Sequence, residues 1–310
     1  MIPPVITAIA DIRAAIAEAR ATGQSIGFVP TMGALHAGHA SLIRAARTQT
    51  DFVVVSIFVN PTQFGPNEDF SRYPRTMAAD RELCGAVGTD LIFSPAPTDI
   101  YPEGSSTFVE VVGLGDHLCG PSRPGHFRGV ATVVLKLFHI VQPDTAFFGQ
   151  KDAQQARIIQ QMVADLHVPV KVEIVPTVRE PDGLAMSSRN RYLDPVQRGQ
   201  ASILYRSLEM AKELASAGER DVGKLETFLL AEIASTPGTT LDYARIVDAS
   251  TLQPIAALER PALAALAVYF GNTRLIDNVM LIAYAPSGMN GDDPCSRDAQ
   301  ASGAERGETR

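Results

Sequence analysis

The feature that most constrains the fold is a short segment in which an apolar run passes through a turn into a helical pattern. Ile26 to Val29 form the apolar run, Pro30 and Gly33 break it, and the helical pattern then continues to Arg47. Such a strand–turn–helix pattern is typical of the first βα unit of a nucleotide-binding α/β domain. The chain is therefore expected to place a ligand site at this turn.

Two histidines stand at the start of the helical pattern. His36 and His39 are three residues apart, so both project from one side of the first helical turn. Gly38 between them leaves the backbone open to close approach by a ligand. The free N–H groups and the positive dipole end of a helix start suit a phosphate. Histidine donors there would neutralise charge that builds up on a transferring phosphoryl group. The order His-x-Gly-His resembles the signature of nucleotidylyltransferases and class I aminoacyl-tRNA synthetases.

Strand-like and helical patterns alternate along the first 175 residues. We expect strands at 25–29, 51–59, 90–93, 107–112, 145–148 and 170–175, and helices at 12–20, 42–47, 76–87, 131–141 and 152–166. The run 51–59 is continuous and largely β-branched, as expected of a strand buried on both faces of a parallel sheet. The alternation predicts an α/β fold with a Rossmann-like, doubly wound parallel sheet. Ligands bind such sheets at the carboxyl ends of the strands, and His39, Gln63 and Lys151 each follow a predicted strand closely.

The composition changes near residues 187–195, and a different pattern follows. Helices are expected at 197–217 and 222–235, then strands at 241–247, 264–270 and 278–283. We therefore predict a Rossmann-like, nucleotide-binding domain over 1–186 and a smaller, lid-like α+β domain over 187–285. Residues 286–310 are rich in Gly, Ser, Asp and charge, with almost nothing apolar, which predicts a disordered tail.

Bulk composition restricts the class of protein. The 310 residues are 45% hydrophobic and 20% charged, as in an ordinary soluble globular protein. A net charge of −7 argues against a general nucleic-acid binder, so anionic substrates must be held by local positive charge. The cysteines Cys84, Cys119 and Cys295 are far apart and indicate neither a zinc site nor a disulfide framework. No signal peptide or membrane-length run is apparent, and we expect a cytoplasmic enzyme.

Three further segments carry polar groups that suit anions or small polar substrates. Gln63 follows a buried strand and offers both a donor and an acceptor. Residues 122–130 contain two arginines and a histidine before a helix, which fits anion binding or an ordinary solvated loop equally well. Lys151 stands at a helix start, where the dipole opposes a cation, so a structural reason for it is weak. Of Gln154 and Gln155, whichever faces the cleft is the candidate for substrate contact.

Residues 183–190, Gly-Leu-Ala-Met-Ser-Ser-Arg-Asn, contain two hydroxyls and a cation. The segment resembles a shortened form of the Lys-Met-Ser-Lys-Ser loop that closes over triphosphate in His-x-Gly-His enzymes. An interdomain hinge is the alternative. No Gly-Lys-Ser/Thr phosphate loop occurs in the chain, so ATP would have to bind through the histidine motif.

Taken in order and spacing, these motifs resemble the pantothenate synthetase (pantoate–β-alanine ligase) family. The resemblance runs to about residue 285 and rests on these segments: Pro-Thr-Met-Gly-x-Leu-His-x-Gly-His, Phe-Val-Asn-Pro-x-Gln-Phe, Tyr-Pro-Arg-Thr, Arg-Pro-Gly-His-Phe-Arg-Gly-Val, Gly-x-Lys-Asp-x-Gln-Gln and Ser-Ser-Arg-Asn. It implies that ATP and pantoate form pantoyl-adenylate and pyrophosphate, and that β-alanine then yields pantothenate and AMP. It also implies a requirement for Mg²⁺ and a homodimer.

The resemblance also implies roles for individual residues. His39, His36 and Lys151 are the implied catalytic residues, with both histidines on the phosphates and His39 as the proton donor. The implied ATP-binding residues are Met32, Gly33, Ala34, Leu35, His36, Ala37, Gly38, His39, Gly149, Gln150, Lys151, Asp152, Val178, Met186, Ser187, Ser188 and Arg189. Val178 would contact adenine or ribose. Gln63 and Gln155 would bind pantoate, with Gln63 also near β-alanine. The metal ligands are not implied.

The chain departs from the family pattern at two places. Gln150 stands where many relatives have Glu, and the final tail is extra; neither change removes a charged catalytic residue.

Two alternative functions remain open from the sequence. One alternative is another His-x-Gly-His nucleotidylyltransferase that releases a dinucleotide product. The other is a degenerate nucleotide-binding or scaffold domain, which the presence of His36, His39, Lys151 and Arg189 disfavours. The partners expected are small molecules, with no nucleic acid and no membrane.

Overall fold

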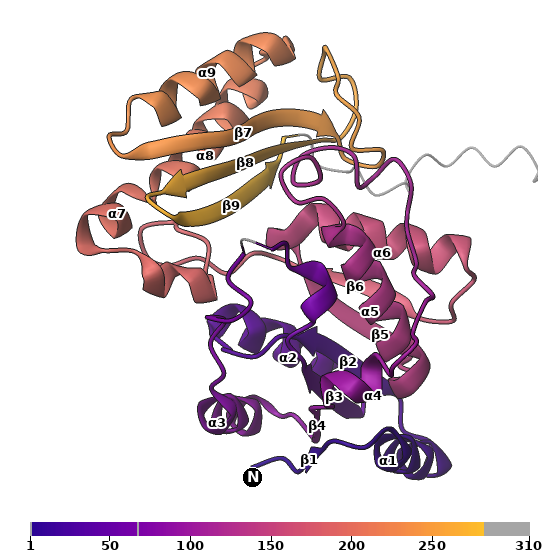
Figure 1. Cartoon of the computed structure of the whole chain (residues 1–310). Coiled ribbons are helices and arrows are strands. Elements are labelled where there is room, and N and C mark those ends of the chain that lie inside the picture. The colour runs from indigo at the N-terminus through magenta and orange to yellow at the C-terminus, as the bar shows by residue number, and fades with distance from the viewer. Residues whose placement is uncertain (1, 67, 282–310) are drawn as a thin grey trace, which may run out of the picture.

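The computed structural model describes residues 2–66 and 68–281 (Figure 1). The predicted tail and Cys295 lie outside the described residues. The strands are β1 (Val5–Ile6), β2 (Ile26–Thr31), β3 (Phe52–Ile57), β4 (Leu91–Phe93), β5 (Thr145–Gly149), β6 (Lys171–Val175), β7 (Thr239–Asp248), β8 (Ala262–Phe270) and β9 (Thr273–Met280). The helices are α1 (Ile9–Ala21), α2 (Ala37–Gln49), α3 (Met77–Val87), α4 (Pro97–Ile100), α5 (His126–Val141), α6 (Ala153–Asp165), α7 (Pro195–Gln200), α8 (Ile203–Ser216) and α9 (Val222–Ala234), with short 3₁₀ helices η1 (Pro61–Gln63), η2 (Gln150–Asp152) and η3 (Ser188–Tyr192).

The first six strands form one parallel sheet with the order β1-β4-β3-β2-β5-β6. Strand order reverses between β2 and β5, which pair through Gly27 with Thr145 and through Phe28 with Ala146. Because a doubly wound sheet opens a crevice at such a reversal, the segments that follow β2 and β5 are the ones placed to bind a ligand.

Alternation of side chains along the strands divides the apolar residues between two faces of this sheet. Phe28 and Val54 pack with residues of α1, α5 and α6, whereas Val29, Val53 and Val55 pack with residues of α2 and α3. These side chains are fully buried. Burial of apolar residues on both faces is the physical reason that the strand sequences read as continuous apolar runs.

The last three strands form a separate antiparallel sheet with the order β7-β8-β9. Ala264, Leu266 and Val268 of β8 pack with α8 and α9, while Leu263 and Ala265 on the other face line a cavity toward the first sheet. Figure 1 shows this sheet (orange to yellow) above the first one, with α8 and α9 on its outer side. The small sheet therefore turns its open face toward the first unit, and its own helices cover the opposite face.

The structure confirms the predicted fold class, a doubly wound parallel sheet with a smaller α+β unit. It contradicts the strand predicted at 107–112, which is an irregular segment with Phe108 52% and Val112 85% exposed. Apolar residues there have no neighbouring strand to pair with. The helix predicted at 197–217 is two helices, α7 and α8, and the last strand begins at Thr273 rather than at 278. The domain boundary at residue 187 stays a prediction.

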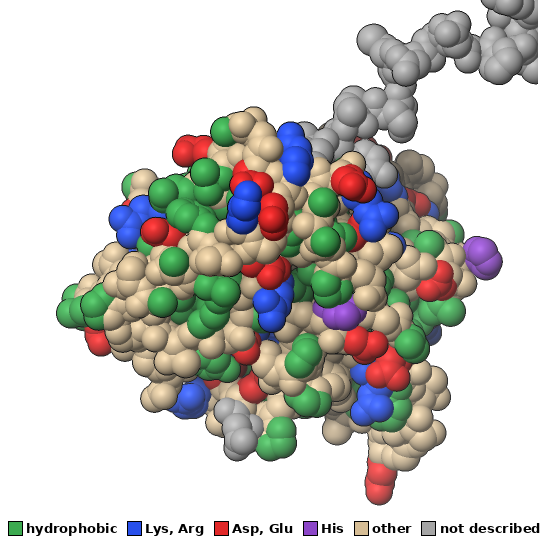
Figure 2. All heavy atoms as spheres, turned by 90° about the horizontal axis from the view of Figure 1, so that it is seen from above, with side chains coloured by type: hydrophobic (Ala, Val, Ile, Leu, Met, Phe, Trp, Pro, Cys, Tyr) green, Lys and Arg blue, Asp and Glu red, His purple; other side chains and the backbone are tan. Residues whose placement is uncertain are grey.

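Charged side chains of both signs are interspersed with apolar ones on the face that Figure 2 shows. Among the described residues of that face, neither sign forms a broad patch. No helix of the described residues is long and apolar enough to span a bilayer.

A buried aspartate fixes the turn between β2 and α2. Asp80 of α3 is 2% exposed and accepts hydrogen bonds from the backbone N–H groups of Ala34 (3.0 Å) and Leu35 (2.8 Å) and from the Thr76 hydroxyl (3.1 Å). Gly33 has a φ of +82°, a conformation that disfavours residues with a Cβ. Packing of α3 against the sheet therefore determines how the chain approaches His36.

We expect Asp80→Ala to lower the free energy of unfolding by about 2–3 kcal/mol, because the buried N–H of Ala34 and the partly buried N–H of Leu35 lose a charged acceptor. Urea denaturation measures the change. Asp11→Ala, which removes an exposed carboxylate from the first turn of α1, is the control and should change stability by less than about 1 kcal/mol. Equal stability losses in the two variants would show that Asp80 does not hold the turn.

Candidate active site

Two adjoining cavities lie at the carboxyl ends of the parallel strands. The smaller, of about 230 Å³, is lined by residues that follow β2, β3, β5 and β6. The larger, of about 750 Å³, lies between the first unit and the antiparallel sheet. Lys151, Asp152 and Gln155 line both cavities, as do Ser187 and Arg189. The motifs that are distant in the sequence therefore meet at one place, beside the strand reversal.

The two histidines form a reciprocal cap at the start of α2. The His36 side chain accepts a hydrogen bond from the Gly38 N–H (3.1 Å), and the His39 side chain accepts one from the His36 N–H (3.3 Å). Their rings lie 4.2 Å apart between centroids. A Cβ at Gly38 would come within 2.8 Å of the His36 ring. Close approach of the His36 ring therefore favours glycine at this position, and Gly38 also lines the smaller cavity, so close approach by a ligand stays a prediction.

These hydrogen bonds fix the tautomer of both rings. Each Nδ1 atom accepts from a backbone N–H, so in each neutral ring the proton resides on Nε2, which is left as a donor. Burial lowers the pKa of His36 to about 4, and the Lys151 charge contributes in the same direction. Burial, followed by His36 and Lys151, lowers the pKa of His39 to about 3. Both rings are therefore neutral hydrogen-bond donors at pH 7.

The amide of Gln63 is held in a defined orientation at the end of η1. Its Oε1 accepts from Asn60 Nδ2 (3.0 Å), and its Nε2 donates to Met32 Sδ (3.2 Å). Asn60 is 1% exposed and also binds the Gly129 carbonyl and the Tyr101 hydroxyl. Because a thioether is a weak acceptor, the Gln63 amide N–H retains most of its capacity to bind a polar ligand.

An arginine–histidine pair supports the backbone at Gln63. The Arg123 guanidinium donates to His126 Nε2 (2.9 Å), so the ring proton is on Nδ1 and is donated to the Gln63 carbonyl (2.8 Å). Arg123 also forms a bidentate pair with Glu68 (2.7 and 2.6 Å). Burial and then the Arg123 charge lower the pKa of His126 to about 4. This part of the 122–130 segment is therefore built into the wall of the site and is not a solvated loop.

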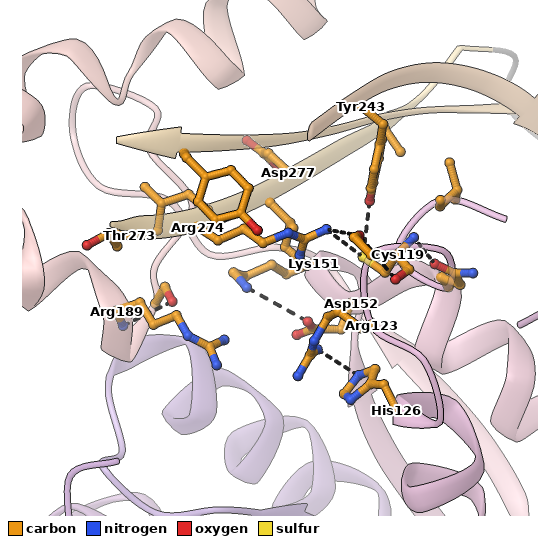
Figure 3. A pocket seen from close by; sticks show the side chains of 18 of the residues that line it. Cys119, Arg123, His126, Lys151, Asp152, Arg189, Tyr243, Thr273, Arg274 and Asp277 are labelled. Carbon is orange, nitrogen blue, oxygen red and sulfur yellow. Dashed lines mark hydrogen bonds and ion pairs between the residues drawn. The ribbon is translucent and has the colours of Figure 1, made fainter. Parts of the chain in front are cut away.

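Two cations from different segments face the cavities (Figure 3). The Lys151 ammonium in η2 lies 3.8 Å from Asp152, with 22% of its side chain exposed. Arg189 in η3 makes a bidentate pair with Asp69 (3.2 and 2.9 Å). Burial alone would raise the pKa of Asp69, but the Arg189 guanidinium outweighs it and lowers that pKa. The site thus combines two cations with neutral histidine donors.

The far wall of the larger cavity comes from the antiparallel sheet. Arg274 donates to Asp242 (2.6 Å), and the Tyr243 hydroxyl lies 3.2 Å from the Cys119 sulfur (Figure 3). Ser122 also bonds Asp242 (3.0 Å). These contacts join the 113–125 segment to β7 and β9. Cys84 and Cys119 are buried, and no disulfide joins them within the described residues.

The sequence model described as pantoate-beta-alanine ligase matches residues 4–280. The chain belongs to the pantoate–β-alanine ligase family. It is 57% identical over 273 residues to the pantothenate synthetase of Moorella thermoacetica, covering 88% of this chain and 96% of that one. Pantothenate synthetase of Pelotomaculum thermopropionicum is 58% identical over 273 residues (88% and 97% covered).

Solved structures of the family share the fold. Pantothenate synthetase from Thermus thermophilus superimposes with a TM-score of 0.86 at 45% identity, covering 90% of this chain and 99% of that one. Pantoate-beta-alanine ligase from Francisella tularensis, described as complexed with beta-gamma ATP and beta-alanine, gives 0.73 at 36% identity (90% and 98% covered). The resemblance inferred from the motifs is thereby confirmed.

Most residues expected to bind substrates in this family line the cavities. They are Met32, His36, Gly38, His39, Gln63, Gly149, Lys151, Asp152, Gln155, Val178, Met186, Ser187, Ser188 and Arg189. Gly33, Ala34, Leu35, Ala37 and Gln150 line neither cavity. Gln155 lines both cavities. Gln154 is instead 6% exposed, and its amide donates hydrogen bonds to the carbonyls of Leu114 and His117 and accepts one from the Cys119 N–H. The roles of all these residues stay predictions.

Three residues that line the cavities, Asn60, Tyr73 and Asn278, are not among those that the sequence predicts to bind substrates, although Asn60 and Tyr73 stand in the quoted family motifs. Tyr73 is 6% exposed and lines the smaller cavity. The Asn60–Pro61 step after an apolar strand was the available signal for Asn60. Nothing in the sequence linked Asn278 to the site, because its partners lie more than 100 positions away.

We expect the imidazoles of His36 and His39 to stay neutral from pH 8 down to about 5.5, because burial disfavours their charged form. Carbon-13-resolved NMR titration of the histidine rings measures this, with His36→Gln and His39→Gln used for assignment. A lowered pKa means that the imidazolium forms only well below pH 6.5. A midpoint near pH 6.5 for either ring would contradict the expectation.

Proposed function

We propose that this protein condenses pantoate with β-alanine, at the expense of ATP, to give pantothenate, AMP and pyrophosphate. The observation that carries the proposal is that His36, His39, Lys151 and Arg189 all line the smaller cavity, in a chain matched by the pantoate–β-alanine ligase family over 4–280. A carboxylate is a poor electrophile, and adenylation gives it a good leaving group. The reaction is therefore proposed to proceed through pantoyl-adenylate.

In the first half-reaction, a pantoate carboxylate oxygen attacks the α-phosphorus of ATP and pyrophosphate leaves. We assign His36 and His39 as Nε2–H donors to phosphate oxygens and Lys151 and Arg189 as cations on the departing charge. Such preorganised donors and in-line positioning account for most catalysis of phosphoryl transfer. In the proposed complex Arg189 exchanges Asp69 for phosphate oxygens. A proton-donor role for His39 requires that the bound phosphates raise its low pKa.

In the second half-reaction, the β-alanine amine attacks the acyl carbon, AMP leaves, and the amine loses a proton. Gln63 and Gln155 are assigned to pantoate, with Gln63 also near the β-alanine site. The residues Met32, Gly33, Ala34, Leu35, Ala37, Gly38, Gly149, Gln150, Asp152, Val178, Met186, Ser187 and Ser188 complete the proposed ATP site. Cover by the antiparallel sheet would shield the acyl-adenylate from water.

Mg²⁺ is proposed to enter with ATP. The described residues contain no group of three or more His, Cys, Asp or Glu side chains placed to hold a metal. Mg²⁺ in nucleotide sites is commonly held by phosphate oxygens, water and one or two carboxylates. Asp152, which lines both cavities with 47% of its side chain exposed, fits as that carboxylate. The ion would neutralise triphosphate charge.

Two wider properties are also proposed on the family resemblance. We propose a homodimer and a cytoplasmic location, with no nucleic-acid or membrane partner. Sedimentation equilibrium at several concentrations tests the dimer, and a monomer throughout would contradict it.

Exchange of labelled pyrophosphate into ATP, with β-alanine absent, tests the proposed function. Exchange should depend on pantoate, and AMP should accumulate stoichiometrically with pantothenate once β-alanine is added. Release of a dinucleotide instead would favour another nucleotidylyltransferase. Tight nucleotide binding without turnover of any kind would favour a non-catalytic nucleotide-binding domain.

We expect His39→Ala to slow single-turnover formation of pantoyl-adenylate by on the order of 10²–10³, and His36→Ala by somewhat less, because each removes a preorganised donor to the transition state. Pantoate affinity should change little. Rapid-quench measurement of the adenylate gives the rate. A wild-type rate in His39→Ala would remove this residue from the catalytic machinery.

Lys151→Ala should also impair adenylation while leaving the melting temperature nearly unchanged, because a partly exposed lysine contributes little to stability. Lys151→Arg should restore only part of the rate, since a planar fork replaces a compact charge. Steady-state rates and thermal melts of the three proteins provide the comparison. Full activity in the Arg variant would mean that net charge alone matters at this position.

A further inference from the structure

The side chain of Asn278 connects the antiparallel sheet to the segment that carries Lys151. Asn278 lies in β9 and is 6% exposed. Its Nδ2 donates to the backbone carbonyls of Gln150 (3.0 Å) and Lys151 (2.9 Å). Its Oδ1 accepts from Gln150 Nε2 (3.1 Å). One buried amide therefore binds η2 at three points.

The orientation of this amide is fixed by its partners. Backbone carbonyls only accept hydrogen bonds, so the Nδ2 atom must face them and Oδ1 must face the Gln150 side chain. Both N–H donors of the amide are used. A carboxylate of the same shape would place a negative oxygen against two carbonyl oxygens. Residue 278 must therefore supply two hydrogen-bond donors and one acceptor, which an asparagine amide does and an aspartate of similar size does not.

The neighbouring residue holds β9 in place. Asp277 is 1% exposed and makes a bidentate pair with Arg179 (2.6 and 3.1 Å). The Arg179 guanidinium in turn lies over the Tyr205 ring, 4.1 Å from its centroid. Figure 3 shows Asp277 on the strand that passes across Lys151. Because Asp277 anchors the strand independently, the position of Asn278 over η2 is defined.

We propose that Asn278 is a positioning residue for adenylation, acting through Lys151 and not by touching substrate. This inference rests on the proposed function. Displacement of η2 moves the Lys151 ammonium, and misplacement of a catalytic group by about 1 Å can cost on the order of 10²-fold in rate. The geometry of Lys151 then depends on contact with a strand of the other sheet, so the antiparallel sheet contributes to catalysis besides covering the site.

A double-mutant cycle tests this dependence. Asn278→Asp and Lys151→Ala are made singly and together, and single-turnover formation of pantoyl-adenylate is measured at saturating ATP and pantoate. Asn278→Asp alone should lose on the order of 10²-fold in rate, with little change in the KM for pantoate. In the Lys151→Ala background the same change should cost less than about threefold, because the group it positions is gone.

Two further variants keep the cycle interpretable. Gln253→Glu adds the same charge at an exposed loop position and should leave the rate unchanged. Asn278→Ser retains one donor without added charge, and it replaces Asn278→Asp in the cycle if thermal melting shows that the Asp variant is unfolded. An equal loss on changing Asn278 in both Lys151 backgrounds would overturn the proposal, since Asn278 would then act independently of the lysine.

Hydrogen–deuterium exchange separates this inference from the proposed function. Peptides covering 149–155 should exchange faster in Asn278→Asp than in the wild type, whatever reaction the protein catalyses. Unchanged exchange in that segment would overturn the positioning role. Absence of pantoate-dependent adenylation in the wild-type protein would instead overturn the proposed function. The exchange result would then still show whether Asn278 holds the segment 149–155 in place.

Discussion

The parallel pairing of β2 with β5 is the constraint on which the rest of the site depends. These two strands are adjacent in space but separated by more than 100 residues, and the chain leaves them in directions that open a crevice. The helix start after β2 brings the two histidines, and η2 after β5 brings Lys151. The pairing of the two strands brings their donors together.

Burial determines the chemistry of the histidines in this crevice. Enclosure favours the neutral rings, and backbone N–H groups occupy both Nδ1 atoms, so each ring offers one directed N–H. Lys151 and Arg189 supply the positive charge. This division has a physical advantage, because neutral donors avoid the repulsion that four clustered cations would create before an anion enters.

The sequence predicted the parts of this protein that depend on local pattern and failed where distant contacts decide. Alternating strands and helices predicted the doubly wound sheet, and the His-x-Gly-His spacing predicted the histidine pair. The apolar residues at 107–112 looked like a strand, yet strand formation requires a neighbouring strand to pair with, and 107–112 has none. Gln154 and Gln155 were indistinguishable in the sequence because only tertiary packing decides which one is buried. Asn278 had no local signal because its partners lie in another unit.

The acidic residues at 68 and 69 have a consequence for anion selectivity. The Glu68 carboxylate accepts two hydrogen bonds from Arg123, and the Asp69 carboxylate accepts two from Arg189. Adjacent carboxylates therefore act as internal competitors for the two guanidinium groups. A small anion such as chloride cannot reproduce a two-point contact and gains little by replacing the Asp69 carboxylate, whereas a polyphosphate can present several oxygens at once. A solute that displaces Asp69 from Arg189 must therefore replace a two-point contact, which a monatomic ion such as chloride does not offer.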